Sequence, residues 1–198
     1  MRYENKTTKK CQYMRGFTII ELLVVLAIIL IIPMIVISNV PIIKLQFALS
    51  NATYEFAQDL RMAQNMALSP LEYKDSFGIL QPIDGYGISI DFDDVGNVKY
   101  RVYADKKQGN QVYDPLDYIV KTIDLGNRPG IVIKEIRTDE FNRSSRQASI
   151  NFSHANTYLS IYKNTKSQTM IEVVFAIDSD QTRTKIVSVN SAGLIEIR

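Results

Sequence analysis

An uninterrupted apolar segment near the start of the chain constrains the fold more than any other feature. No polar side chain occurs from Leu22 to Ile37, and further apolar residues flank this run on both sides. A helix needs about 20 mostly apolar residues to cross a bilayer, and the extended segment reaches that length. We therefore expect residues 17–43 to form a helix that lies in a lipid bilayer.

Charge asymmetry predicts how this helix is oriented. Residues 1–16 carry five basic side chains and one acidic side chain, whereas the short stretch after the apolar segment offers only Lys44. Lys and Arg mark the cytoplasmic flank of a membrane helix. We expect a single pass through the cytoplasmic (inner) membrane, with the N-terminus inside and the C-terminus outside. The rest of the chain is slightly acidic in total, which does not favour a general nucleic-acid-binding protein.

A single carboxylate, Glu21, lies inside the apolar context. A charge near hydrocarbon is costly, so Glu21 is a functional candidate that needs a partner. The small residue that a processing enzyme would require is Gly16, which precedes the apolar run, whereas a secretory signal has its cut site after the run. A cut after Gly16 would remove a basic leader, residues 1–16, and leave the apolar helix on the mature chain.

The stretch from Arg15 to Ile28, RGFTIIELLVVLAI, resembles the prepilin signature of type IV pilins and type II secretion pseudopilins. The resemblance implies that a prepilin peptidase cuts between Gly16 and Phe17, that Phe17 becomes N-methylated, and that Glu21 recruits the next subunit during assembly. The partners it implies are this peptidase, other pilins or pseudopilins, an inner-membrane assembly platform and the lipid bilayer. The assembled filament would lie in the periplasm, in the cell envelope or at the cell surface.

Elementary electrostatics supports these roles. Phe17 and Glu21 are four residues apart, so a helix would place them on one face. The amine that cleavage creates at Phe17 would neutralise the Glu21 of a neighbouring subunit, and this pairing would favour one axial offset between subunits. The alternative is a plain membrane anchor, with an incidental glutamate, on an extracytoplasmic domain that never polymerises.

Two prolines interrupt the pattern of the helix. Proline removes one helical hydrogen bond and clashes with the preceding turn. We expect a kink or local melting at Pro33 and a bend at Pro41.

Residues 44–69 are predicted to form an amphipathic second half of the helix, ending before Pro70. Apolar residues recur there at helical spacing and define one face: Leu45, Leu49, Ala52, Phe56, Leu60, Ala63 and Ala67. Four polar residues are expected to lie off this face: Glu55, Asp59, Arg61 and Gln64. The sequence of residues 57–68 also resembles the H-type minor pseudopilins and their FimT-like relatives.

Residues 70–198 are predicted to form a β-rich extracytoplasmic domain, because their apolar pattern has a period of two. The expected strands are 86–92, 98–104, 118–124, 130–137, 147–152, 157–162, 170–177, 184–190 and 193–198. The predicted fold class is therefore α+β, with a long N-terminal helix packed on an antiparallel sheet or small sandwich of about seven to nine strands. The segment VNSAGLIEI, residues 189–197, resembles the last hairpin of the same pseudopilin subfamily.

Calcium binding is considered and not predicted. Asp91, Asp93 and Asp94 lie at a predicted turn, and Asp105, Asp114 and Asp117 follow along the chain. Such oxygen ligands suit calcium, but their spacing fits no complete loop and lacks a closing bidentate glutamate. Turns favour aspartate for local hydrogen bonding in any case.

DNA binding is the second function that the sequence leaves open. The candidate residues are Arg143, Arg146, Lys163 and Lys166, which with Arg137, Arg183 and Lys185 give the last third of the chain a basic character. FimT-like pilins that serve DNA uptake bind DNA through basic C-terminal residues, so the resemblance implies a possible DNA-binding minor pilin of a competence pilus. A solvated surface explains the same residues.

Enzymatic activity is not predicted. His154 is the only histidine and no nucleophile motif accompanies it, while Cys11 is the only cysteine. The chain has no glycine-rich phosphate loop, so no cofactor is predicted either.

Overall fold

The computed structural model describes residues 16–69, 72–75, 77–92, 98–106, 111–127, 130–138, 147–153, 157–161 and 168–198. Within these ranges only the backbone is described at residues 35–39, 92, 147 and 157–161. The chain divides into two compact units, Met1–Pro41 and Ile42–Arg198.

A single long helix, α1 (Ile19–Ala67), belongs to both units. The helix is continuous through Pro33 and Pro41, so the local melting expected at Pro33 does not occur. One proline removes only one hydrogen bond, and the cooperativity of a long helix maintains the turns around it.

In the first unit, the apolar side chains of α1 face outward in every direction. All described side chains from Phe17 to Met34 are exposed, including Leu30 at 73%. A helix that is apolar on all sides requires an apolar environment or neighbouring helices. No helix in the described part of the chain is long and apolar enough to span a membrane.

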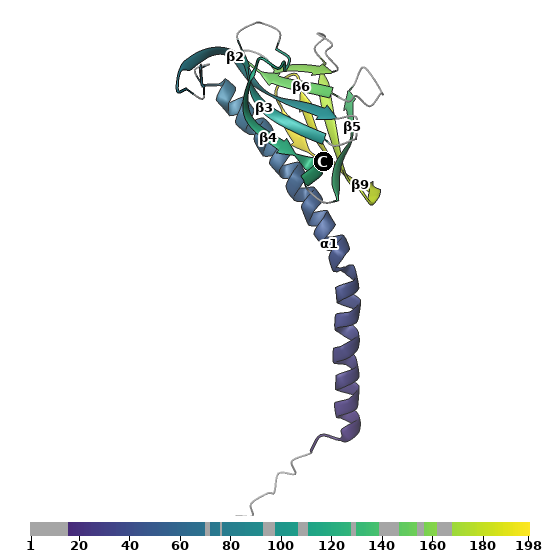
Figure 1. Cartoon of the computed structure of the whole chain (residues 1–198). Coiled ribbons are helices and arrows are strands. Elements are labelled where there is room, and N and C mark those ends of the chain that lie inside the picture. The colour runs from purple at the N-terminus through teal and green to yellow at the C-terminus, as the bar shows by residue number, and fades with distance from the viewer. Residues whose placement is uncertain are drawn as a thin grey trace, which may run out of the picture. The chain divides into compact units, whose positions relative to one another are not determined.

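The second unit contains the remainder of α1 and two antiparallel sheets (Figure 1). Among the described residues, ten strands and a 3₁₀ turn follow the helix: β1 (Glu72–Lys74), β2 (Leu80–Phe92), β3 (Val98–Lys106), β4 (Tyr118–Asp124), η1 (Leu125–Asn127), β5 (Ile131–Thr138), β6 (Gln147–Phe152), β7 (Thr157–Ile161), β8 (Met170–Ile177), β9 (Asp180–Asn190) and β10 (Ile195–Ile197). The first sheet has the order β4-β3-β2-β6-β7, with β1 also paired to β2, and the second has the order β10-β9-β8-β5. The predicted α+β class is confirmed.

The strand predictions are wrong mainly at the ends of elements. β1 was not expected, and β2 begins at Leu80 rather than at residue 86 because Pro82 and Gly85 conceal its first part in the sequence. A shift of register between Ile83 and Gly85 accommodates this irregular stretch. β9 begins at Asp180, inside a segment whose composition is typical of a turn.

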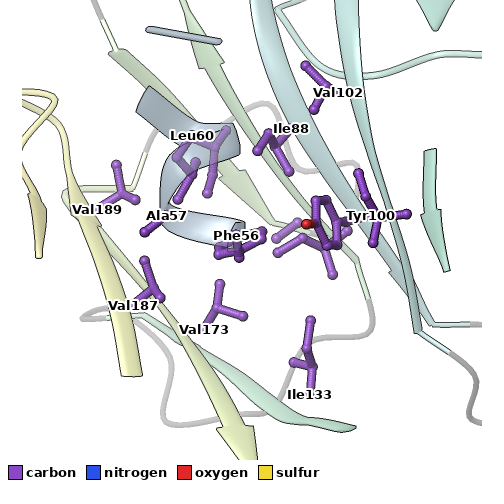
Figure 2. Packing of buried hydrophobic residues seen from close by; sticks show 14 of the residues in the cluster. Phe56, Ala57, Leu60, Ile88, Tyr100, Val102, Ile133, Val173, Val187 and Val189 are labelled. Carbon is purple, nitrogen blue, oxygen red and sulfur yellow. The ribbon is translucent and has the colours of Figure 1, made fainter. Parts of the chain in front are cut away.

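The core of the second unit is built around the apolar face of α1. Figure 2 shows Phe56, Ala57 and Leu60 between Val187 and Val189 of β9 on one side and Ile88 and Tyr100 of the first sheet on the other. The Phe56 ring lies 5.1 Å from the Tyr100 ring at 90°, and 5.4 Å from the Phe175 ring. The predicted apolar face is confirmed. Leu45 is partly buried, and the other six residues of the face are at most 4% exposed: Leu49, Ala52, Phe56, Leu60, Ala63 and Ala67.

The prediction that Asp59 lies off the buried face of α1 is wrong. Its side chain is buried, with only 5% exposed. Two sheets contact the helix, so the buried sector is wider than the apolar stripe. Asp59 accepts a hydrogen bond of 2.9 Å from the Tyr100 hydroxyl and forms a 2.8 Å ion pair with Lys121. Partners of this kind offset the cost of burying a carboxylate.

Candidate functional site

The start of α1 forms a reciprocal cap between Thr18 and Glu21. The backbone N–H and the hydroxyl of Thr18 donate to Oε2 of Glu21 at 3.0 and 3.1 Å. The backbone N–H of Glu21 donates in return to the Thr18 hydroxyl at 3.3 Å. Thr18 precedes the first helical residue, so the pair is a capping box. The sequence analysis missed this role, although the spacing Thr-x-x-Glu before an apolar run indicates it.

Phe17 lies before the helix, not within it. The expectation that helical geometry places Phe17 and Glu21 on one face is therefore wrong for the uncut chain. The Phe17 side chain is 87% exposed, so this part of the uncut chain does not bury it.

Gly16 occupies open space. A Cβ atom built on Gly16 would meet nothing within 4 Å, whereas one on Gly85 would come within 2.4 Å of the Phe152 carbonyl oxygen. The fold therefore requires glycine at position 85 and imposes no such requirement at position 16.

The DNA-binding candidates receive no support from the described residues. Arg143, Arg146, Lys163 and Lys166, with the single histidine His154, lie outside the described residues. Three further basic residues of the same region have partners within the protein: Arg137 with Glu135, Arg183 with Asp180 at 3.0 Å, and Lys185 over the Tyr54 ring at 5.4 Å.

The calcium candidates are also divided between described and undescribed residues. Asp93 and Asp94 lie outside the described ranges, whereas Asp91 forms an ion pair of 3.7 Å with Arg101. Asp114 and Asp117 lie close together, since the backbone N–H of Asp114 donates to Oδ2 of Asp117 at 2.8 Å. Among the described residues, no group of three or more His, Cys, Asp or Glu side chains is arranged to hold a metal ion.

Comparison with known proteins adds one finding. The family model for the prokaryotic N-terminal methylation motif matches residues 11–32, which include Gly16, Phe17, the capping box and the first turns of α1. This match supports the type IV pilin and pseudopilin superfamily at the level of the N-terminal segment. No curated protein and no solved structure matches the chain.

Proposed function

We propose that the chain is a minor subunit of a type II secretion pseudopilus or a type IV pilus, processed by prepilin peptidase and assembled into a membrane-anchored filament. The observation that supports this proposal is the methylation motif at residues 11–32, because these residues include both the proposed cut site and the start of the long helix. The role is structural, and motion would come from a cytoplasmic motor that drives growth and retraction.

The proposed processing separates a basic leader, residues 1–16, from a mature chain that begins at Phe17. Among the described residues, nothing lies within 4 Å of a Cβ atom built on Gly16, and this supports the cut, because a peptidase can approach a backbone that has no side chain. Thr18 and Glu21 both follow the cut, so the capping box would stay intact in the mature chain. The new amine would be N-methylated at Phe17.

The proposed assembly uses the exposed apolar surface of the first unit. Side chains such as Leu22, Ile29 and Leu30 are more than half exposed and would contact lipid before assembly and neighbouring helices afterwards. Glu21 would pair with the Phe17 amine of a neighbouring subunit, which neutralises two charges in an apolar setting. The first unit would anchor the chain in the inner membrane, with residues 42–198 on the outer side.

The second unit would form the outer surface of the filament. Its part of α1 is fixed by contacts with both sheets, through Phe56 to Tyr100 and Phe175. Force that reaches this part of the helix would pass to both sheets through these packed contacts.

Replacement of Gly16 by glutamate tests the proposed processing. The full chain is expressed in cells that contain a prepilin peptidase, and the mature N-terminus is determined by mass spectrometry. Wild-type chain should begin at an N-methylated Phe17, and Gly16→Glu should retain residues 1–16. Glu21→Gln is the matched control and should be cut like the wild type. Equal maturation of Gly16→Glu and wild type, or trimming beyond Met34, would contradict the proposal.

A further inference from the structure

The outer face of the first sheet, opposite the core, contains a buried polar pair. Asp105 of β3 and Asn151 of β6 flank the intervening strand β2, where they lie beside Gly85 and Gly87. Both side chains are 0% exposed, and Nδ2 of Asn151 donates to Oδ2 of Asp105 at 3.0 Å. A Cβ atom on Gly85 would come within 2.6 Å of Oδ1 of Asn151, so glycine on β2 gives the pair its space.

One oxygen of each side chain is left without a hydrogen bond. Within the described residues, Oδ1 of Asp105 and Oδ1 of Asn151 are both buried without a partner. An unsatisfied buried acceptor costs about 1–3 kcal/mol, so two on adjacent side chains require an explanation. Oδ1 of a charged Asp105 and Oδ1 of Asn151 are both acceptors and cannot form a hydrogen bond with each other. A proton on the Asp105 carboxyl group would supply the missing donor. A carboxylic acid and an amide can form a ring of two hydrogen bonds, one donated by each group.

The surroundings of Asp105 disfavour a negative charge. Asp84 of β2 and Asp114 and Asp117 of the segment before β4 all interact unfavourably with a charged Asp105. Lys106, the adjacent cation on β3, places its amino group over the Tyr118 ring at 5.7 Å. No salt bridge within the described residues reaches Asp105.

We propose that Asp105 carries a proton in the closed form of the folded chain, that it forms an acid–amide ring with Asn151, and that this ring keeps residues 111–117 closed over the first sheet. In the ring, Nδ2 of Asn151 donates to Oδ2 of Asp105, and the acid proton on Oδ1 of Asp105 is donated to Oδ1 of Asn151. Both unpaired oxygens are then satisfied by one proton.

The electrostatic environment of the carboxyl group agrees with this arrangement. Burial, followed by the charges of Asp117 and Asp84, raises the pKa of Asp105 from 3.8 to about 7. The folded state therefore holds a proton that the unfolded chain has already lost above pH 3.8. The stability that this proton contributes is complete below that pH and is lost as the pH rises through about 7.

Residues 111–117 are held in place by contacts with β3 and β6, the two strands that contain Asp105 and Asn151. Oδ1 of Asp117 accepts the backbone N–H of Lys106 at 2.9 Å, and its Oδ2 accepts that of Asp114 at 2.8 Å. The N–H of Tyr113 donates to Oγ of Ser149 at 3.3 Å, and the Tyr113 ring contacts the Tyr103 ring at 5.3 Å. Loss of the Asp105 proton would break the ring and add a further negative charge to those of Asp114 and Asp117, which opens the segment.

Amide hydrogen exchange and carboxyl NMR test the proposal on the full chain in detergent micelles. Between pH 6 and pH 8, protection of the Lys106 and Asp114 amides should fall by up to about tenfold after correction for intrinsic exchange. In Asp105→Asn, which stays neutral, the change should be less than about twofold. Asp91→Asn is the control, since its carboxylate is ion-paired on the same sheet, and it should retain the wild-type fall.

Three results would overturn the proposal. The first is a wild-type Asp105 whose carboxyl carbon chemical shift titrates near pH 4. This measurement uses the wild type alone, so it does not depend on the folding of a variant. The second is the same fall in protection in Asp105→Asn as in wild type. The third is restoration of protection at pH 8 by added calcium chloride in wild type but not in Asp105→Asn, which would identify the unpaired oxygens as ligands of a cation.

Discussion

The hydroxyl group of Tyr100 donates a hydrogen bond of 2.9 Å to Oδ2 of Asp59, and this bond joins α1 to the first sheet inside the core. Lys121 of β4 adds an ion pair to the same carboxylate at 2.8 Å. A polar connection of this kind fixes how the helix is rotated against the sheet, because a small rotation would separate the partners.

Asp59→Ala should lower the free energy of unfolding by about 2–4 kcal/mol, because it removes the buried hydrogen bond between the Tyr100 hydroxyl and the carboxylate. Lys121 adds little to this loss, since its side chain is 40% exposed. Urea denaturation of the full chain in micelles measures the change. Asp59→Asn keeps an acceptor and should lose less, and the exposed Gln58→Ala should stay within about 0.5 kcal/mol of wild type.

Phe56→Ala should be the most destabilising single change in α1. Phe56 is 0% exposed and contacts both sheets, so truncation removes about 3–5 kcal/mol from the stability of the second unit. The matched control is Phe47→Ala, nine residues earlier in the same helix, where the side chain is 65% exposed. Equal midpoints of denaturation for the two variants would show that the helix does not pack between the sheets as described.

The face of α1 was predictable because helical periodicity is a local property of the sequence. Leu49, Phe56 and Leu60 are buried where their spacing indicates. The bounds of β4, β6 and β8 were predicted correctly for the same reason, since alternation needs only neighbouring residues. Burial of Asp59 was not predictable in this way, because it depends on Tyr100, 41 residues away.

The polar features of the chain likewise divide into those set by neighbouring residues and those set by contacts distant in the sequence. The capping box joins residues only three apart, so the local sequence contains its signal, although the box was not predicted. The pair of Asp105 and Asn151 joins residues 46 apart. It forms only because β2 lies between β3 and β6 and has glycines opposite both residues. No sequence period specifies which strands become neighbours in a sheet.

Gly85→Ala should destabilise the second unit by about 1–3 kcal/mol or prevent its folding, because the new methyl group would overlap the Phe152 carbonyl oxygen at 2.4 Å. Backbone atoms of a central strand cannot move aside without breaking the ladder of β2 and β6. Gly16→Ala makes the same chemical change in open space and should leave the denaturation midpoint unchanged. Equal effects of the two substitutions would contradict the close packing at position 85.

Glu21 has two separable roles, the cap that the structure contains and the intersubunit charge pair that we propose. Glu21→Gln keeps a side-chain acceptor for the Thr18 N–H and removes the charge, whereas Glu21→Ala removes both. If the charge recruits the next subunit, both variants should be cut normally after Gly16 and both should fail to form filaments in the native host. Electron microscopy of sheared filaments, with immunoblotting of the mature subunit, measures this.

A different pattern would assign Glu21 to capping alone. In that case Glu21→Gln assembles like wild type. Glu21→Ala is impaired only because the first turn of α1 loses helicity, and the missing cap lowers the stability of the helix by about 1 kcal/mol. Thr18→Val provides the matched control, because it removes the hydroxyl that accepts the Glu21 N–H and keeps the carboxylate. A charge-pair role predicts that Thr18→Val still assembles, since the carboxylate that receives the neighbour's amine is unchanged.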